Sequence, residues 1–124
     1  MKIRIKGNSV RLRLTKTEVE AFNEEGKYLE TVQFANKTLT YVLEAKDNIT
    51  SLESDYQDDT ITVYFPEQEK HTWATSNRVG YSNEVDWNDP TALSILVEKD
   101  FTCLDNTIED QSDNYPNPKL KKGK

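Results

Sequence analysis

The sequence predicts an α+β fold: a single antiparallel, strongly twisted sheet of about six to eight strands, able to curl towards a barrel, with one well-defined helix and a second short one. Several short segments alternate apolar and polar residues with a period of two, which is typical of half-buried strands. One segment carries complete start and stop signals for a helix. Turn residues separate the strands by short distances, which favours antiparallel neighbours over parallel crossovers.

The chain opens on two basic strands. Residues 2–6 alternate isoleucine with lysine or arginine, and residues 10–14 alternate valine or leucine with arginine. Between them, Gly7-Asn8-Ser9 moves the apolar positions from odd to even numbers, so this segment is predicted to be a turn or a bulge. One face of this unit is therefore aliphatic. The other face holds up to five cations, namely Lys2, Arg4, Lys6, Arg11 and Arg13.

A helix is predicted directly after these strands. Thr15 and Glu18 have the spacing of a capping box, in which the hydroxyl and the carboxylate satisfy backbone N–H groups at the helix start. Gly26 provides the C-terminal stop. The helix is therefore expected over Lys16–Glu25, with its apolar residues Val19 and Phe22 packed on the sheet.

Further strands are expected at short spacing along the chain, over residues 28–34, 38–45, 49–53, 60–65, 79–81 and 84–87. An acidic turn is expected over residues 55–59, and Pro66 can begin a short helix that runs to about Ala74 and places Trp73 against the sheet. Residues 91–101 form the last expected strand. Because residues 93–97 are almost all apolar, this strand is predicted to be central and covered on both faces.

Length and composition allow one domain with a modest core. The chain has 124 residues, of which 35% are hydrophobic and 12 are aromatic. A chain of this length buries roughly two-thirds of its unfolded surface. After Leu104 the sequence becomes polar, and Pro116 and Pro118 disfavour regular structure. We expect one α+β domain over residues 1–104 and a polar, proline-containing tail over residues 105–124.

Charge is distributed unevenly. Residues 1–16 contain six cations and no acid, whereas all 22 acids lie between Glu18 and Asp113, a stretch whose formal charge is −16. The net charge of −6 disfavours general nucleic-acid binding, because phosphate neutralisation needs a basic surface. The simplest explanation of the asymmetry is that the basic strands pair with acidic neighbours in the sheet.

Cysteine content and hydropathy suggest a cytoplasmic protein. A single cysteine allows no internal disulfide and no cysteine-rich zinc site. No apolar run is long enough to cross a membrane, and the first residues have no apolar leader. We therefore expect a cytoplasmic location, no cofactor and no membrane partner.

The basic face is the most specific candidate site. Alternating lysine and arginine on adjacent strands can converge on phosphate or carboxylate groups. The leading hypothesis is a non-catalytic module that binds a small anion or an acidic protein segment through Lys2, Arg4, Lys6, Arg11 and Arg13. Another hypothesis, also without catalysis, is a structural subunit that pairs with a partner through an edge strand.

An enzyme remains the main alternative. Basic strands also line the barrel of the metal-dependent phosphohydrolases of the CYTH superfamily, where acidic residues on facing strands hold the metal. This chain lacks the Glu-x-Glu-x-Lys pattern of that superfamily, so the similarity is one of fold. The carboxylates available as metal ligands in such a barrel are Glu44, Glu53, Glu84 and Glu98.

A second set of carboxylates lies towards the end of the chain. Carboxylates gathered in one loop can hold Mg²⁺ or Ca²⁺, and the candidates are Glu98, Asp105, Glu109, Asp110 and Asp113. Their spacing matches neither an EF-hand nor a Walker motif, so turn capping is the favoured explanation. His71 and Cys103 belong to no nucleophile motif. We predict no catalytic residue, and we expect Cys103 to be a small buried hydrophobe.

The chain resembles a family of small uncharacterised bacterial proteins of unknown function, over almost its whole length. The opening match comprises Ile3-Arg4-Ile5-Lys6-Gly7-Asn8-Ser9, Arg11-Leu12-Arg13-Leu14-Thr15 and Glu18-Val19. The later matches are Trp73, Val79-Gly80, Leu96-Val97-Glu98-Lys99-Asp100-Phe101, Cys103-Leu104, Glu109-Asp110, Ser112-Asp113 and Pro116-Asn117-Pro118. The resemblance implies a single-domain protein, and it assigns no activity, cofactor, partner or catalytic residue.

Overall fold

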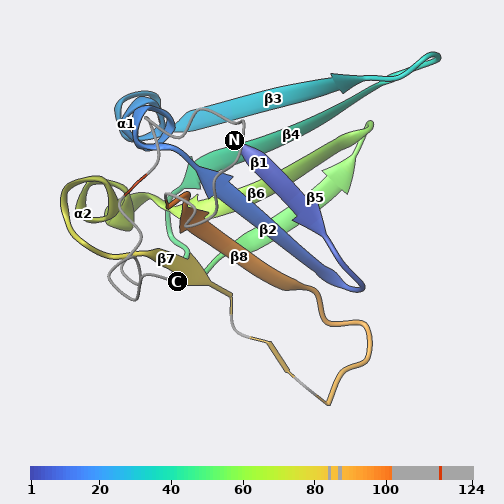
Figure 1. Ribbon diagram of the computed structural model, residues 1–124. Helices are drawn as coiled ribbons and strands as arrows, with labels where there is room; N and C mark the ends of the chain where they lie inside the picture. Colours follow the sequence, from blue (N-terminus) through green and yellow to red (C-terminus); the bar gives the residue numbers. More distant parts are fainter. Residues whose placement is uncertain (84, 87, 102–114, 116–124) are drawn as a thin grey trace, which may run out of the picture.

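Two four-stranded sheets and two helices make up the computed structural model, which describes residues 1–83, 85, 86, 88–101 and 115 (Figure 1). The first sheet has the order β1–β2–β8–β7, with β1 at Lys2–Ile5, β2 at Ser9–Leu14, β7 at Gly80–Ser82 and β8 at Ser94–Lys99. The second sheet has the order β3–β4–β6–β5, with β3 at Lys27–Gln33, β4 at Thr38–Lys46, β5 at Glu53–Gln57 and β6 at Thr60–Pro66. The helices are α1 at Lys16–Glu25 and α2 at Lys70–Thr75, the latter preceded by a 3₁₀ turn at Glu67–Glu69.

The prediction of a single antiparallel sheet is wrong. Each sheet consists of two antiparallel hairpins joined by a parallel pair in the middle, β2 with β8 in the first sheet and β4 with β6 in the second. The two sheets remain separate and do not close into a barrel. Turn residues specify which neighbours form a hairpin, whereas the pairing between hairpins depends on contacts between residues far apart in sequence. Local signals therefore identified most of the strands but not their arrangement.

The order of elements is the same in both halves of the chain. A hairpin, a helix and a second hairpin follow each other as β1, β2, α1, β3 and β4, and again as β5, β6, α2, β7 and β8. Each sheet takes one hairpin from each half. The sequence shows no repeat because the corresponding positions share residue class rather than identity.

Corresponding residues in the two halves occupy similar environments. Phe22 of α1 and Trp73 of α2 are 51 positions apart and both are fully buried. The hydroxyl of Tyr81 donates to Oε1 of Glu69 at 2.9 Å. Tyr28 and Glu18 form the corresponding pair in the first half, at 3.5 Å. The halves therefore repeat the same packing of a helix against a sheet.

The capping signals of α1 are confirmed. The Thr15 hydroxyl accepts from the backbone N–H of Glu18, and the Glu18 carboxylate accepts from the backbone N–H of Thr15 at 2.9 Å. Gly26 ends the helix in the left-handed region at φ 76°, where a side chain would be strained. The buried face consists of Val19 and Phe22, as predicted.

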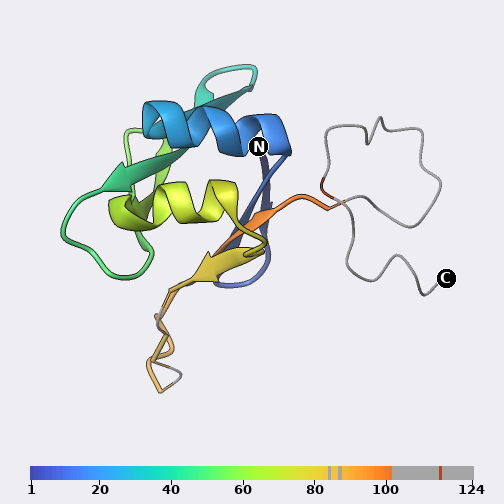
Figure 2. The same cartoon turned by 90° about the vertical axis from the view of Figure 1, so that its left-hand side faces the viewer.

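The core lies between the two sheets and beneath the helices, which pack side by side at one end of the molecule (Figure 2). At this end an aromatic cluster joins both helices to both sheets. The ring of Phe65 lies 5.2 Å from Trp73, 5.3 Å from Phe22 and 4.8 Å from Tyr81. The predicted second helix is thus confirmed, with Trp73 buried beneath it.

One predicted strand and its neighbouring turn are misplaced. Of the strand predicted over residues 49–53, only Glu53 lies in a strand, as the first residue of β5. This strand covers residues 55–57 of the segment predicted as a turn over residues 55–59. Ile49 and Leu52 are buried core residues within a connection, so their hydrophobicity reflects packing rather than strand alternation. The turn consists of Asp58 and Asp59, both with positive φ, a conformation that aspartate tolerates in hairpins.

The last strand is central as predicted, but only one of its faces is covered. β8 lies between β2 and β7, with Ile95 and Val97 buried and Leu96 half-buried on the opposite face. That opposite face carries the charged residues of β2 beside Glu98. Of the strand predicted over residues 84–87, Glu84 and Trp87 lie outside the described residues, and the two residues between them form no strand.

The predicted tail and Cys103 lie outside the described residues, except for Tyr115. The backbone N–H of Tyr115 donates to the carbonyl of Asp100 at 2.8 Å, and its ring lies 5.8 Å from that of Phe101. Within the described part of the chain, neither helix has the length and hydrophobicity needed to cross a membrane.

Tyr81 is expected to make stability depend on pH in the alkaline range. Burial, with a smaller contribution from the hydrogen bond to Glu69, raises the pKa of Tyr81 from 10.0 to about 12. Above pH 10 the unfolded chain loses this proton first, so the folded state loses stability until the pH passes about 12. We expect Tyr81 to contribute about 2–3 kcal/mol to this loss.

Urea unfolding at several pH values should show a smaller loss of stability in Tyr81→Phe than in the wild-type protein. The control Tyr56→Phe removes an exposed phenol, and equal slopes in all three proteins would contradict the prediction.

Candidate functional site

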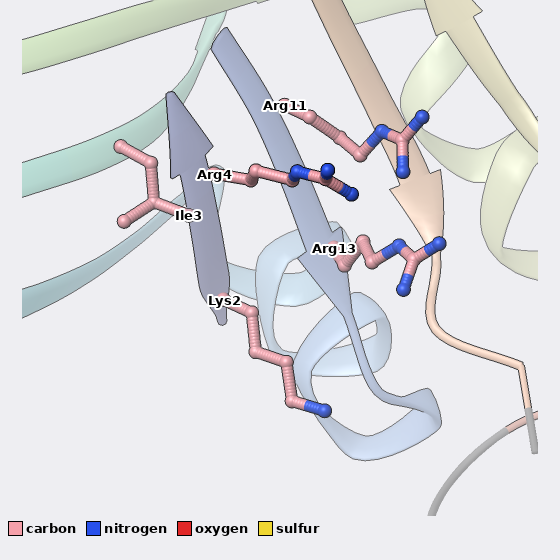
Figure 3. A pocket seen from close by; sticks show the side chains of 5 residues that line it. All are labelled: Lys2, Ile3, Arg4, Arg11 and Arg13. Carbon is pink, nitrogen blue, oxygen red and sulfur yellow. The ribbon is translucent and has the colours of Figure 1, made fainter. Parts of the chain in front are cut away.

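Four of the five predicted cations share the outer face of the first sheet (Figure 3). Lys2 and Arg4 come from β1, and Arg11 and Arg13 come from β2. Strand alternation turns the intervening apolar residues towards the core, and Ile3 points to the opposite side in Figure 3. These four residues are called the basic face below.

Like charges stand directly opposite each other on the basic face. The register pairs Arg4 with Arg11 and Lys2 with Arg13. Like charges at directly opposed positions of an antiparallel pair destabilise the sheet, because their Cβ atoms are only about 5 Å apart. The hairpin therefore concentrates positive charge at a local cost in stability.

Two carboxylates neutralise part of this charge. One oxygen of Glu98, on β8, lies 3.7 Å from Nε of Arg11 and 3.8 Å from Nε of Arg13. Nζ of Lys2 lies 3.2 Å from Oδ2 of Asp100. Arg4 makes no ion pair with any residue that the structure describes. The predicted pairing of basic strands with acidic neighbours is thus present but incomplete.

The three arginines of the basic face have guanidinium N–H groups that donate to no described residue. The two distances to Glu98 exceed the usual hydrogen-bond range, and no described residue accepts a hydrogen bond from the side chain of Arg4, Arg11 or Arg13. Lys2, Ile3 and the three arginines line a hollow of about 190 Å³. A planar guanidinium with open donors matches a carboxylate or phosphate group in geometry.

Lys6 is the predicted cation that does not join this hollow. It lies in the turn between β1 and β2, where its backbone exchanges two hydrogen bonds of 3.2 Å with Ser9. The turn places it beyond the end of the strand pair that aligns the other four cations.

The predicted metal ligands are not brought together. Glu98 faces Arg11 and Arg13, whereas Asp105, Glu109, Asp110 and Asp113 lie outside the described residues. The described part of the chain contains no cluster of three or more histidine, cysteine, aspartate or glutamate residues able to hold a metal ion.

The barrel alternative fails on geometry. Its cations would have to point into a closed interior opposite carboxylates, but the basic face points outward from an open pair of sheets. By strand alternation Glu44 and Glu53 lie on the outer face of the second sheet, and Glu84 lies outside the described residues. His71 is exposed on α2.

Sequence reasoning missed the two charged residues at the end of β8. Lys99 is 4% exposed and donates from Nζ to the carbonyl of Ser76 at 2.7 Å, and burial lowers its pKa. Asp100 is 3% exposed, and its Oδ2 is the atom that pairs with Nζ of Lys2 at 3.2 Å. The burial of Lys99 could have been predicted, because the alternation of β8 puts it on the same face as Ile95 and Val97.

These features define a two-sheet α+β protein with a cationic outer face. The chain belongs to a family of unknown function, DUF7009, whose model matches residues 1–119. The prediction that it is a domain of unknown function is thus confirmed. No curated protein and no solved structure matches the chain.

Proposed function

We propose that this protein is a cytoplasmic, non-catalytic module whose basic face binds an anionic group. The observation that carries the proposal is the direct opposition of Arg4 and Arg11, with Arg4 making no ion pair among the described residues. A ligand anion placed between these side chains would offset their repulsion and accept hydrogen bonds from both.

The hollow favours a small anionic group over a large enclosed ligand. A volume of about 190 Å³ is smaller than the roughly 300–1,000 Å³ of ordinary small-molecule pockets. A carboxylate or phosphate group is of suitable size, and the rest of its molecule would remain in solvent. Both a small anion and an acidic protein segment supply such a group. Because β1 is an edge strand, an extended acidic segment could also add backbone hydrogen bonds along it.

Charge removal tests the proposal. The test uses a triple variant with the substitutions Arg4→Gln, Arg11→Gln and Arg13→Gln. Titration calorimetry at low salt measures how the wild-type protein and this variant bind tripolyphosphate and a glutamate-rich peptide. We expect at least one probe to bind the wild-type protein, and the triple variant to bind it at least tenfold more weakly. The two probes separate a phosphate anion from an acidic protein segment as the source of the anionic group.

A matched variant controls for net charge. The control variant removes the same number of positive charges from exposed positions away from the basic face, by Lys16→Gln, Lys27→Gln and Lys37→Gln. It should bind each probe like the wild-type protein. Urea unfolding should show that the arginine variant is as stable as the wild-type protein or more so. If it is instead clearly less stable, by an amount that fades as salt rises, the arginines are structural ion-pair partners and the proposal is wrong.

A further inference from the structure

The inter-sheet space is open at the end opposite the helices. In Figure 1 the helices lie on the left, whereas the turns of the β1–β2 and β5–β6 hairpins lie on the right. At that end a cavity of about 600 Å³ lies between the two sheets. Three of its apolar lining residues come from the first-sheet side, Ile5, Val10 and Leu93, and three from the second sheet, Leu39, Tyr56 and Ile61.

The lining repeats between the two halves of the chain. The register pairs Ile5 with Val10 in the first hairpin and Tyr56 with Ile61 in the corresponding hairpin, 51 positions later. Hydrogen bonds between equivalent backbone groups brace both sides of the opening, from Ser94 N–H to the Asn8 carbonyl at 3.1 Å and from Thr40 N–H to the Asp59 carbonyl at 3.0 Å. Apart from Leu93, which precedes β8, the apolar residues that line the cavity belong to the two sheets.

Large apolar side chains are left uncovered at this end. By register, Ile5, Val32 and Tyr56 lie on the inner faces of their strands, yet they are 59%, 38% and 67% exposed. Inner-face residues nearer the helices, such as Leu12, Leu43 and Val63, are almost fully buried. Exposed apolar surface gathered in one place marks a binding site more often than single exposed residues do.

We propose that this cavity binds an uncharged, largely apolar small molecule. Its volume lies within the range of small-molecule pockets, about 300–1,000 Å³, and its lining is mostly aliphatic with one tyrosine. None of the described residues that line it is a cation, which disfavours an anionic ligand. Among the described lining residues, Asp55 alone is charged, and it accepts a hydrogen bond from Nε2 of Gln57 at 2.6 Å. The site is separate from the basic face, because it lies between the sheets rather than on the outer surface of one of them.

Nile red, an uncharged and largely apolar dye, tests this proposal. We expect saturable binding of one dye per protein, with a rise in its fluorescence, and displacement by decanol. Ile61→Trp should fill the cavity and weaken binding at least tenfold. Leu29→Trp is the matched control, since Leu29 is half-exposed opposite Val42 on the outer face of the second sheet, and it should leave binding unchanged.

A second variant guards against a folding defect. Ile5→Ser together with Tyr56→Ser changes two exposed side chains, so the fold should persist while the apolar rim is lost, and dye affinity should again fall at least tenfold. The proposal is overturned if dye binding does not saturate, or if Ile61→Trp and Leu29→Trp affect it equally. It is also overturned if the protein self-associates through this end and excludes the dye.

Discussion

Replacing Trp73 by alanine is expected to lower the free energy of unfolding by about 3–5 kcal/mol, the cost of removing a large aromatic side chain from a packed core. Trp73 is fully buried and its ring contacts Phe65, Phe22 and Tyr81 at centroid distances of 5.2, 6.3 and 6.2 Å. Its indole N–H also donates to the carbonyl of Val79 at 3.2 Å. The substitution therefore removes contacts with both sheets and with the other helix.

Urea unfolding measures this effect. Thr72→Ala is the matched control, because Thr72 is the exposed neighbour of Trp73 on α2 and its change should cost less than about 0.5 kcal/mol. If Trp73→Ala cost less than about 1 kcal/mol, the cluster beneath the helices would not be the centre of the core.

Gly80→Ala is expected to cost about 3 kcal/mol, the upper part of the usual range for overpacking. A Cβ atom at Gly80 would lie 2.2 Å from the carbonyl oxygen of Val97 and 2.9 Å from Cα of Glu98. Both atoms belong to the backbone of β8, so a side-chain rotation cannot relieve the clash. The pairing of β7 with β8 must open instead.

Amide hydrogen exchange locates that opening. In Gly80→Ala the backbone N–H of Lys99, which donates to the carbonyl of Val79 at 2.9 Å, should exchange faster than in the wild-type protein. Ser82→Ala changes an exposed residue of the same strand and should leave both stability and exchange close to those of the wild-type protein. A stable Gly80→Ala variant with unchanged exchange would contradict the prediction.

Elements with local signals could be predicted from the sequence. Thr15, Glu18 and Gly26 determine the ends of α1 through contacts within a few residues, so the predicted bounds are those observed. The hairpins of the basic strands and of β3 with β4 were predictable for the same reason. Ile49 and Leu52 misled the strand assignment, because hydrophobicity does not distinguish a buried connection from a strand.

Local sequence signals do not predict how one hairpin pairs with another. The parallel pairs β2–β8 and β4–β6 bring together strands whose side chains would also suit antiparallel neighbours. The basic face could be predicted, since alternation alone puts Arg4 and Arg11 on one side of the sheet. The acidic partners of the basic face could not be predicted, because Glu98 and Asp100 reach it only through the parallel pairing of β8 with β2.

The parallel pair of β2 and β8 also sets the order in which the chain can fold during synthesis. β2 ends at Leu14, but its partner begins only at Ser94, so the middle of the first sheet stays incomplete until most of the domain has been made. An unpaired strand edge is a template for aggregation, and charged side chains oppose such association. Arg11 and Arg13 place two charges on β2, so the arginines of the basic face oppose association of this strand with other chains while β8 has not yet been synthesised.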